Sequence, residues 1–161
     1  MKVVEIIKDC AEILDVKLTE ATLDDMVHCF NVVENEIAIE YCPLILTETF
    51  QTKDGNVNYS DFKQKVLRII QIHDDDGNNV AYTLSPSYVK ADQNKFNVQY
   101  AYCPGEKRLI DSSDLGEDMR LPLKYGVCCE YCLTQGDFEE AKVWYEKQLR
   151  KLKELQEKRE R

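Results

Sequence analysis

The sequence predicts an α+β fold: a helical bundle built from both chain ends, with an antiparallel β meander inserted between them. Apolar residues recur at helical spacing near both ends. The centre instead carries short β-branched and aromatic runs separated by turn dipeptides. We expect a single domain over residues 1–161, with helices in 1–43, a β region in 44–103, a loop in 104–120 and a helical hairpin with an extended tail in 121–161.

Two amphipathic helices are expected in the first segment. Residues 2–15 place apolar side chains every three or four positions, which is typical of a helix with one apolar face. Thr22 is the predicted N-cap of the second helix, and Asp24 and Asp25 follow where carboxylates favour the helix dipole. Pro43 ends this helix. Each helix leaves one apolar face that another element must cover.

The central region predicts four or five antiparallel strands in a meander. Its β-type runs read LILTETFQT, NVNY, VLRIIQIHD, VAYTL and KFNVQYAY. The Asp-Gly dipeptides at residues 54–55 and 76–77 are typical of tight hairpin turns.

The last two helices are expected to form an antiparallel hairpin. Pro122 suits the first turn of one helix, and Gly136 ends it. Asp137 caps the next helix, with Glu140 completing a capping-box pattern. We expect the tail to fray or reach into a partner, because it is wholly polar after Leu155. The side chains expected to pack across the hairpin are Tyr125, Phe138, Ala141, Trp144 and Tyr145.

The cysteine pattern indicates buried thiols, and no metal site is predicted. The chain has seven cysteines, an odd number, and no secretion signal precedes them. Cys129 and Cys132 form a Cys-x-x-Cys motif, but it lies inside a predicted helix and has no second pair to complete four zinc ligands. We therefore expect reduced, small, apolar side chains.

The sequence gives little sign of catalysis. No nucleophile, base and orienting group can be assembled into one set, and no cofactor motif is present. Four acidic side chains in residues 104–120 are expected to be solvated loop charges, namely Asp111, Asp114, Glu117 and Asp118. We expect that the chain is not an enzyme and binds no cofactor.

The charge is unevenly distributed. The net charge is −9, yet residues 142–161 contain eight Lys or Arg and four Glu, so residues 1–141 carry −13. This balance argues against broad contact with nucleic-acid phosphates, which needs clustered cations. No apolar run approaches the roughly 20 residues that span a bilayer.

The ordered motifs resemble one protein family over most of the chain. They are NEIAIEYCPL, then FNVQYAYCPGEKRL, an acidic loop, and LPLKYGVCCEYCLTQGDFEEAKVWYEKQL. This order is similar to that of the head-to-tail adaptor (connector) proteins of tailed bacteriophages, including the tail tubular and head-completion proteins of short-tailed phages. The resemblance is closest over residues 96–149.

The resemblance implies a structural virion protein of a phage or prophage neck, assembled in the host cytoplasm. Such proteins form oligomeric rings, commonly of twelve copies, between the portal protein and a tail or nozzle protein. DNA passes through the ring as a non-specific passenger during ejection, and no membrane is involved. Position implies portal contacts at Lys147, Arg150, Lys151 and Lys153, and subunit or tail contacts at Asp54, Gly55, Asn56, Asp74, Gly77 and Asn78.

Two alternatives stay open. Residues 125–149 also resemble one tetratricopeptide unit, which suggests a cytosolic helical-hairpin module that grips a partner through an exposed apolar groove. A single unit cannot bury its faces as an array of about three or more does. A small hydrolase using Asp111 and Asp114 would need a base that the sequence does not offer.

Overall fold

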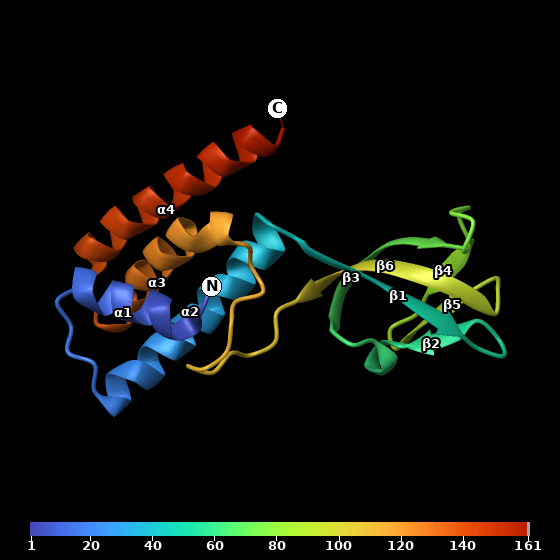
Figure 1. Cartoon of the computed structure of the whole chain (residues 1–161), viewed down its shortest axis with the longest axis horizontal. Coiled ribbons are helices and arrows are strands. Elements are labelled where there is room, and N and C mark those ends of the chain that lie inside the picture. The colour runs from blue at the N-terminus through green and yellow to red at the C-terminus, as the bar shows by residue number, and fades with distance from the viewer. Residues whose placement is uncertain (161) are drawn as a thin grey trace. The chain divides into compact units, whose positions relative to one another are not determined.

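The computed structural model describes residues 1–160, and Arg161 lies outside the described residues. Within residues 1–160 the chain forms four α-helices and six β-strands (Figure 1), which confirms the predicted α+β class. The helices are α1 (Val3–Ile13), α2 (Glu20–Glu40), α3 (Arg120–Thr134) and α4 (Phe138–Arg159). The strands are β1 (Leu44–Gln51), β2 (Asn56–Asn58), β3 (Lys65–His73), β4 (Tyr82–Leu84), β5 (Tyr88–Ala91) and β6 (Lys95–Cys103).

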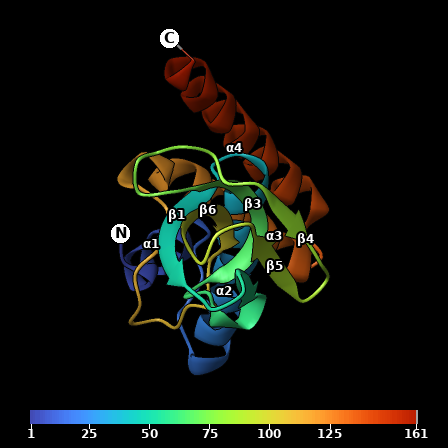
Figure 2. The ribbon, with the colours of Figure 1, turned by 90° about the vertical axis from the view of Figure 1, so that its right-hand side faces the viewer.

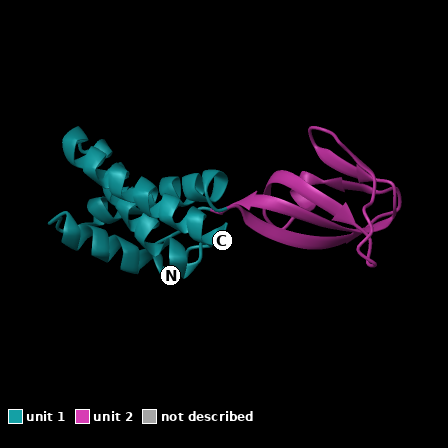
Figure 3. Ribbon diagram, turned by 90° about the horizontal axis from the view of Figure 1, so that it is seen from above, with its two compact units in different colours: residues 1–42, 106–161 teal, residues 43–105 magenta. Residues whose placement is uncertain are grey.

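The chain divides into two compact units (Figure 3). Unit 1 joins the two chain ends, Met1–Cys42 and Glu106–Arg161, and unit 2 is Pro43–Gly105. Each unit has its own buried apolar core. The predicted bundle of N- and C-terminal helices is therefore unit 1, and the inserted β region is unit 2.

In unit 1, α3 is the central helix and contacts α1, α2 and α4. The apolar stripes predicted from the sequence meet around it. The side chains with no exposed surface include Ile6 and Ile7 of α1, Met26, Phe30 and Ile37 of α2, and Leu123 and Val127 of α3. Burial of these stripes supplies the main favourable free energy for the bundle.

The second helix begins earlier than predicted. Thr19, not Thr22, is its N-cap, because the Thr19 backbone is extended and its hydroxyl accepts a hydrogen bond from the Thr22 backbone N–H at 3.3 Å. Thr22 then lies inside the first turn, where its own hydroxyl is 2.7 Å from that of Thr19. A threonine pair three residues apart offers two possible caps, and the upstream one is used here.

The hairpin of α3 and α4 forms as predicted, with one correction. Gly136 has a φ of +78° after α3, and Asp137 caps α4 by accepting from the Glu140 backbone N–H at 3.2 Å. The Tyr125 and Trp144 rings stack at 5.8 Å. Phe138 and Tyr145, however, are 69% and 46% exposed.

The reason for this correction lies in the periodicity of α4. Its buried stripe is Ala141, Trp144, Gln148 and Leu152, which are three or four residues apart and lie on one face. Phe138 and Tyr145, three residues before and four residues after Ala141, lie at the outer edge of that stripe, so both stay largely exposed and do not pack fully across the hairpin as predicted.

In unit 2, the described strands form two three-stranded sheets, in the orders β1-β6-β3 and β2-β5-β4. All pairings are antiparallel, as predicted. The two sheets curve around a common interior (Figure 2). That interior is filled by Val57, Ile72, Val89, Phe96, Val98 and Tyr100, together with smaller contributions from neighbouring residues.

Strand number and order go beyond what the turn signals indicated. Residues 88–91 form the strand β5, which the sequence did not single out. The long strand β6 pairs with both β1 and β3, which are far from it in sequence. Non-local pairing of this kind is decided by burial of one sheet face, which hairpin turn signals do not report.

Candidate functional site

The four cations predicted to meet a portal lie along α4 in different surroundings. Lys147 Nζ lies 4.2 Å from the centroid of the Trp144 ring, and Lys151 Nζ pairs with Glu154 Oε2 at 2.7 Å. Arg150 and Lys153 are exposed and have no ion pair within residues 1–160. They are three residues apart and so lie on one helix face. Of these four cations, Arg150 and Lys153 are therefore the most available to an acidic partner.

The end of α4 is attached to the rest of unit 1. Arg159 Nη2 pairs with Asp118 Oδ2 at 2.6 Å, and Arg159 Nη1 donates to Cys42 Sγ at 3.2 Å. The polar segment after Leu155 accordingly continues as helix to Arg159, instead of fraying as expected.

The first predicted turn tip, Asp54 to Asn56, is divided between surface and core. Asp54 and Asn56 are exposed, and the Asp54 carboxylate accepts from the Asn56 backbone N–H at 3.1 Å. Gly55 is buried, has a φ of +79° and accepts from the Ala91 backbone N–H at 2.9 Å. Its lack of a Cβ is required here, because a Cβ would lie 2.1 Å from the Ala91 carbonyl oxygen. The Gly55 carbonyl thus extends the pairing of β2 with β5 by one hydrogen bond inside unit 2.

The second tip, Asp74 to Asn78, is an exposed turn at the end of β3. The Asp74 carboxylate accepts from the backbone N–H groups of Asn78 at 2.8 Å and Asp76 at 3.0 Å. These bonds, the one from Asn78 first, lower the pKa of Asp74. Gly77 has a φ of +83° and open space around it. The turn is internally bonded, and its outer surface is free for contact.

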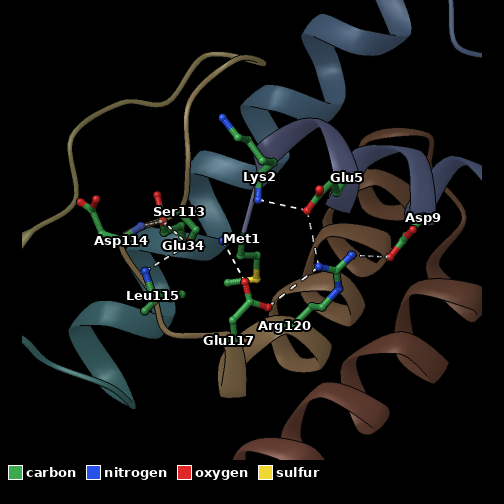
Figure 4. Close-up of polar contacts among 10 residues, drawn as sticks. All are labelled: Met1, Lys2, Glu5, Asp9, Glu34, Ser113, Asp114, Leu115, Glu117 and Arg120. Atoms are coloured by element: carbon green, nitrogen blue, oxygen red, sulfur yellow. Dashed lines mark hydrogen bonds and ion pairs between the residues drawn. The ribbon is translucent and has the colours of Figure 1, made fainter.

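The acidic loop is a set of ion pairs and does not gather into one site. Lys107 pairs with Asp114 at 3.0 Å, and the Met1 amino group pairs with Glu117 at 2.9 Å. Figure 4 shows Arg120 pointing between Glu117 of the loop and the carboxylates of α1. Four acidic side chains of the loop, Asp111, Asp114, Glu117 and Asp118, are therefore each paired with a nearby cation, and the hydrolase alternative gains no support from this geometry.

Arg120 has a partner on each side. Its guanidinium reaches Asp9 at 3.3 Å and Glu5 at 3.6 Å. Asp111 pairs with Arg108 at 3.3 Å. These pairs are partly exposed, so each contributes modestly to stability.

Glu34 is a buried anchor that the sequence reasoning did not single out. It lies on α2 with no exposed surface, and its Oε1 accepts from Ser113 Oγ at 2.6 Å and from the Asp114 backbone N–H at 2.8 Å (Figure 4). Burial raises the pKa of Glu34. A signal was present, since Glu34 lies four residues after Phe30 and three before Ile37, within the apolar stripe of the helix.

Asn31 fastens the same loop one turn earlier. Its Oδ1 accepts from the Lys107 backbone N–H at 2.6 Å, and its Nδ2 donates to the Lys107 carbonyl at 2.9 Å. Asn31 and Glu34 together hold residues 107–114 along α2. The long connection is thus part of the unit 1 structure.

The cysteines are free thiols throughout the described chain, and five are buried as predicted, namely Cys10, Cys29, Cys128, Cys129 and Cys132. Burial raises the pKa of Cys29 and of Cys132 to about 12, so both are neutral near pH 7. Among residues 1–160, no group of three or more His, Cys, Asp or Glu side chains is placed to hold a metal ion.

None of the helices in residues 1–160 is both long enough and apolar enough to cross a membrane. No family model matches the chain, and no curated protein matches it.

Proposed function

We propose that this chain is a head-to-tail adaptor of a tailed bacteriophage or prophage, a non-catalytic virion protein of the neck. It assembles as a ring between the portal protein and the tail or nozzle, and DNA passes through the ring. The observation that carries the proposal is the way the chain is divided. Helices from both ends form one unit, and a β unit is inserted at Pro43–Gly105, which is the arrangement that the resemblance implies.

The charge distribution supports this proposal. A passing genome must slide without binding, and a net charge of −9 repels phosphates. The exposed Arg150 and Lys153 on α4 offer a local cationic face that suits an acidic surface of the portal.

The particle mass of the purified chain, alone and mixed with a portal protein encoded in the same genome, tests the proposal. We expect a ring with a central hole in negative-stain images, formed either by the chain alone or only on the portal. Light scattering gives the mass of the same particle. A chain that stays monomeric or dimeric with the portal present would overturn the proposal.

Reversing charge on α4 tests portal docking. We expect the pair Arg150→Glu and Lys153→Glu to weaken portal association at least tenfold at low salt, because both side chains are exposed and have no ion-pair partner in the part of the chain that the structure describes. The loss should shrink at high salt as screening increases. Lys151→Glu is a useful comparison, because Lys151 is already paired with Glu154. Unchanged portal binding by the double variant would remove this docking surface.

A further inference from the structure

Unit 1 carries an apolar groove beside the hairpin of α3 and α4. The groove has a volume of about 270 Å³ and is lined by Cys129, Leu133, Phe138, Ala141, Lys142 and Tyr145. Its exposed apolar side chains are large: Leu133 is 41% exposed, Phe138 69% and Tyr145 46%. These are the hairpin residues that the bundle core leaves uncovered. A grouped apolar surface of this kind is typical of an interaction site.

Three carboxylates lie on the neighbouring helix surfaces: Glu130 of α3 is next to the lining residue Cys129, and Glu36 and Glu40 are one turn apart on α2. After burial, the nearby charges of Glu130 and Glu36 raise the pKa of Cys129, which lines the groove. Burial, followed by the charges of Glu40 and Glu130, raises the pKa of Glu36 itself. Glu36 is thus close to both Glu40 and Glu130 and is repelled by both.

None of Glu36, Glu40 and Glu130 forms an ion pair within residues 1–160. The acidic loop is different, since Asp111, Asp114, Glu117 and Asp118 each have a cation beside them. The one cation in the groove lining is Lys142. The groove and the three flanking carboxylates, here called the acidic groove, therefore carry uncompensated negative charge.

We propose that the acidic groove binds a cationic amphipathic helix of another protein. An apolar stripe on that helix would cover Leu133, Phe138 and Tyr145, and its Lys or Arg side chains would neutralise the three carboxylates. The proposal goes beyond the adaptor function and does not rest on it. It uses a different set of residues from the Arg150 and Lys153 face.

The surrounding structure decides the kind of occupant. The walls are helices whose backbone groups are bonded internally, so an added β-strand would find no row of free N–H and C=O groups. A second copy is a poor occupant, because its own cationic helix is α4, which is already packed into unit 1 through Leu152 and tied down by Arg159. A helix from a different protein satisfies both the shape and the charge.

The test uses the full-length chain and three synthetic 18-residue peptides. The first has leucines at helical spacing flanked by lysines, the second has the same composition in scrambled order, and the third has glutamate in place of each lysine. Titration calorimetry at low and high salt measures binding. We expect saturable one-to-one binding of the first peptide, and at least tenfold weaker binding of the other two.

Matched variants locate the site. Phe138→Ser and Tyr145→Ser should each weaken binding about fivefold or more, whereas Val143→Ser, an apolar side chain on α4 that is 50% exposed but outside the groove lining, should not. Replacing Glu36, Glu40 and Glu130 by Gln should weaken binding tenfold and flatten its salt dependence. Glu12, Glu106 and Glu157, exposed and unpaired within the described chain, give the same charge change elsewhere and should leave binding intact.

Any of the following three results would overturn the proposal. Equal binding of the patterned and scrambled peptides would mean general attraction to an acidic protein. Absence of binding, with circular dichroism showing a folded chain, would remove the helix as occupant. Self-association that Phe138→Ser abolishes would assign the groove to a second copy.

Discussion

At the scale of single residues, the buried carboxyl group of Glu34 carries a desolvation cost in unit 1. A carboxylate with no exposed surface loses its hydration, and only Oε1 has partners among the described residues. Its two hydrogen bonds hold Ser113 and Asp114 against α2. Glu34 therefore lowers stability through its buried charge, and its two hydrogen bonds fix the path of the loop.

The raised pKa of Glu34 has a definite consequence for stability. A raised pKa in the folded state means that folding favours the protonated form of Glu34. The stability that protonated Glu34 contributes is therefore complete at a pH below its ordinary pKa of 4.5. That stability is lost as the pH rises through the pKa of Glu34 in the folded state. Ionised Glu34 thus lowers the free energy of unfolding at neutral and alkaline pH.

We expect Glu34→Gln to remove this pH dependence. Gln keeps the Oε1 acceptor for Ser113 and Asp114 but cannot ionise. Urea unfolding between pH 5 and pH 8 should show the variant gaining stability over the natural chain as the pH rises. A constant difference between the two proteins across this range would contradict the assignment.

Removing the hydroxyl partner gives the complementary result. Ser113→Ala leaves the carboxylate with one hydrogen bond and removes the acceptor of the Leu115 backbone N–H, so it should lower the free energy of unfolding by about 1–3 kcal/mol, measured by the same unfolding curves. Ser112→Ala is the control, because within residues 1–160 Ser112 makes only a backbone bridge to Lys2. Equal effects of the two substitutions would show that the hydroxyl does not matter.

At the scale of elements, helix positions followed from the sequence more fully than strand positions did. Gly136 and Asp137 mark the α3–α4 boundary through local chemistry, and the structure uses both. The β5 strand at residues 88–91 has a weaker local signal: it pairs with β4 across a short turn at residues 85–87, and with the distant strand β2 through non-local burial. The exposure of Phe138 and Tyr145 was likewise not evident, because apolar character does not say which helix face is covered.

A close contact between α3 and its neighbours α2 and α4 depends on Gly126 of α3. A Cβ there would lie 2.4 Å from Val33 Cγ1 of α2 and 2.4 Å from Gln148 Nε2 of α4. We expect Gly126→Ala to lower the free energy of unfolding by about 1–3 kcal/mol through overpacking, although alanine favours helices. Chemical denaturation monitored by circular dichroism measures this change.

Gly105→Ala is the matched control for Gly126→Ala. It makes the same substitution where the added Cβ has nothing within 4 Å, so its effect should be small. A stable Gly126→Ala protein would mean that α2 and α4 can move apart at no cost.

At the scale of the whole molecule, the sequence predicts one domain, and the structure contains two units with separate cores. The portal-facing and tail-facing roles proposed for the chain can then reside on different units. Sequence patterns placed Arg150 and Lys153 on an exposed helix, but which cations already have partners depended on the folded positions of Glu154 and Trp144.

The two cores lead us to expect separable unfolding. Trp144 is the one tryptophan of the chain and lies in unit 1, so its fluorescence reports that unit alone. Phe96→Ala removes a fully buried ring from unit 2 and should cost about 3–5 kcal/mol there. The circular dichroism transition of the strands should move to lower denaturant while the tryptophan transition stays in place. Coincident transitions would instead establish a single cooperative domain.

The pairing of Leu44 with Tyr102 at the base of unit 2 has a consequence for how such proteins can diversify. The chain goes out along β1 and comes back along β6, so the two splice points are cross-strand neighbours, about 5 Å apart. A different β module with equally adjacent ends could be transplanted at this seam without rebuilding the helices. Recombination between genomes would then be able to replace unit 2 while retaining the helices of unit 1.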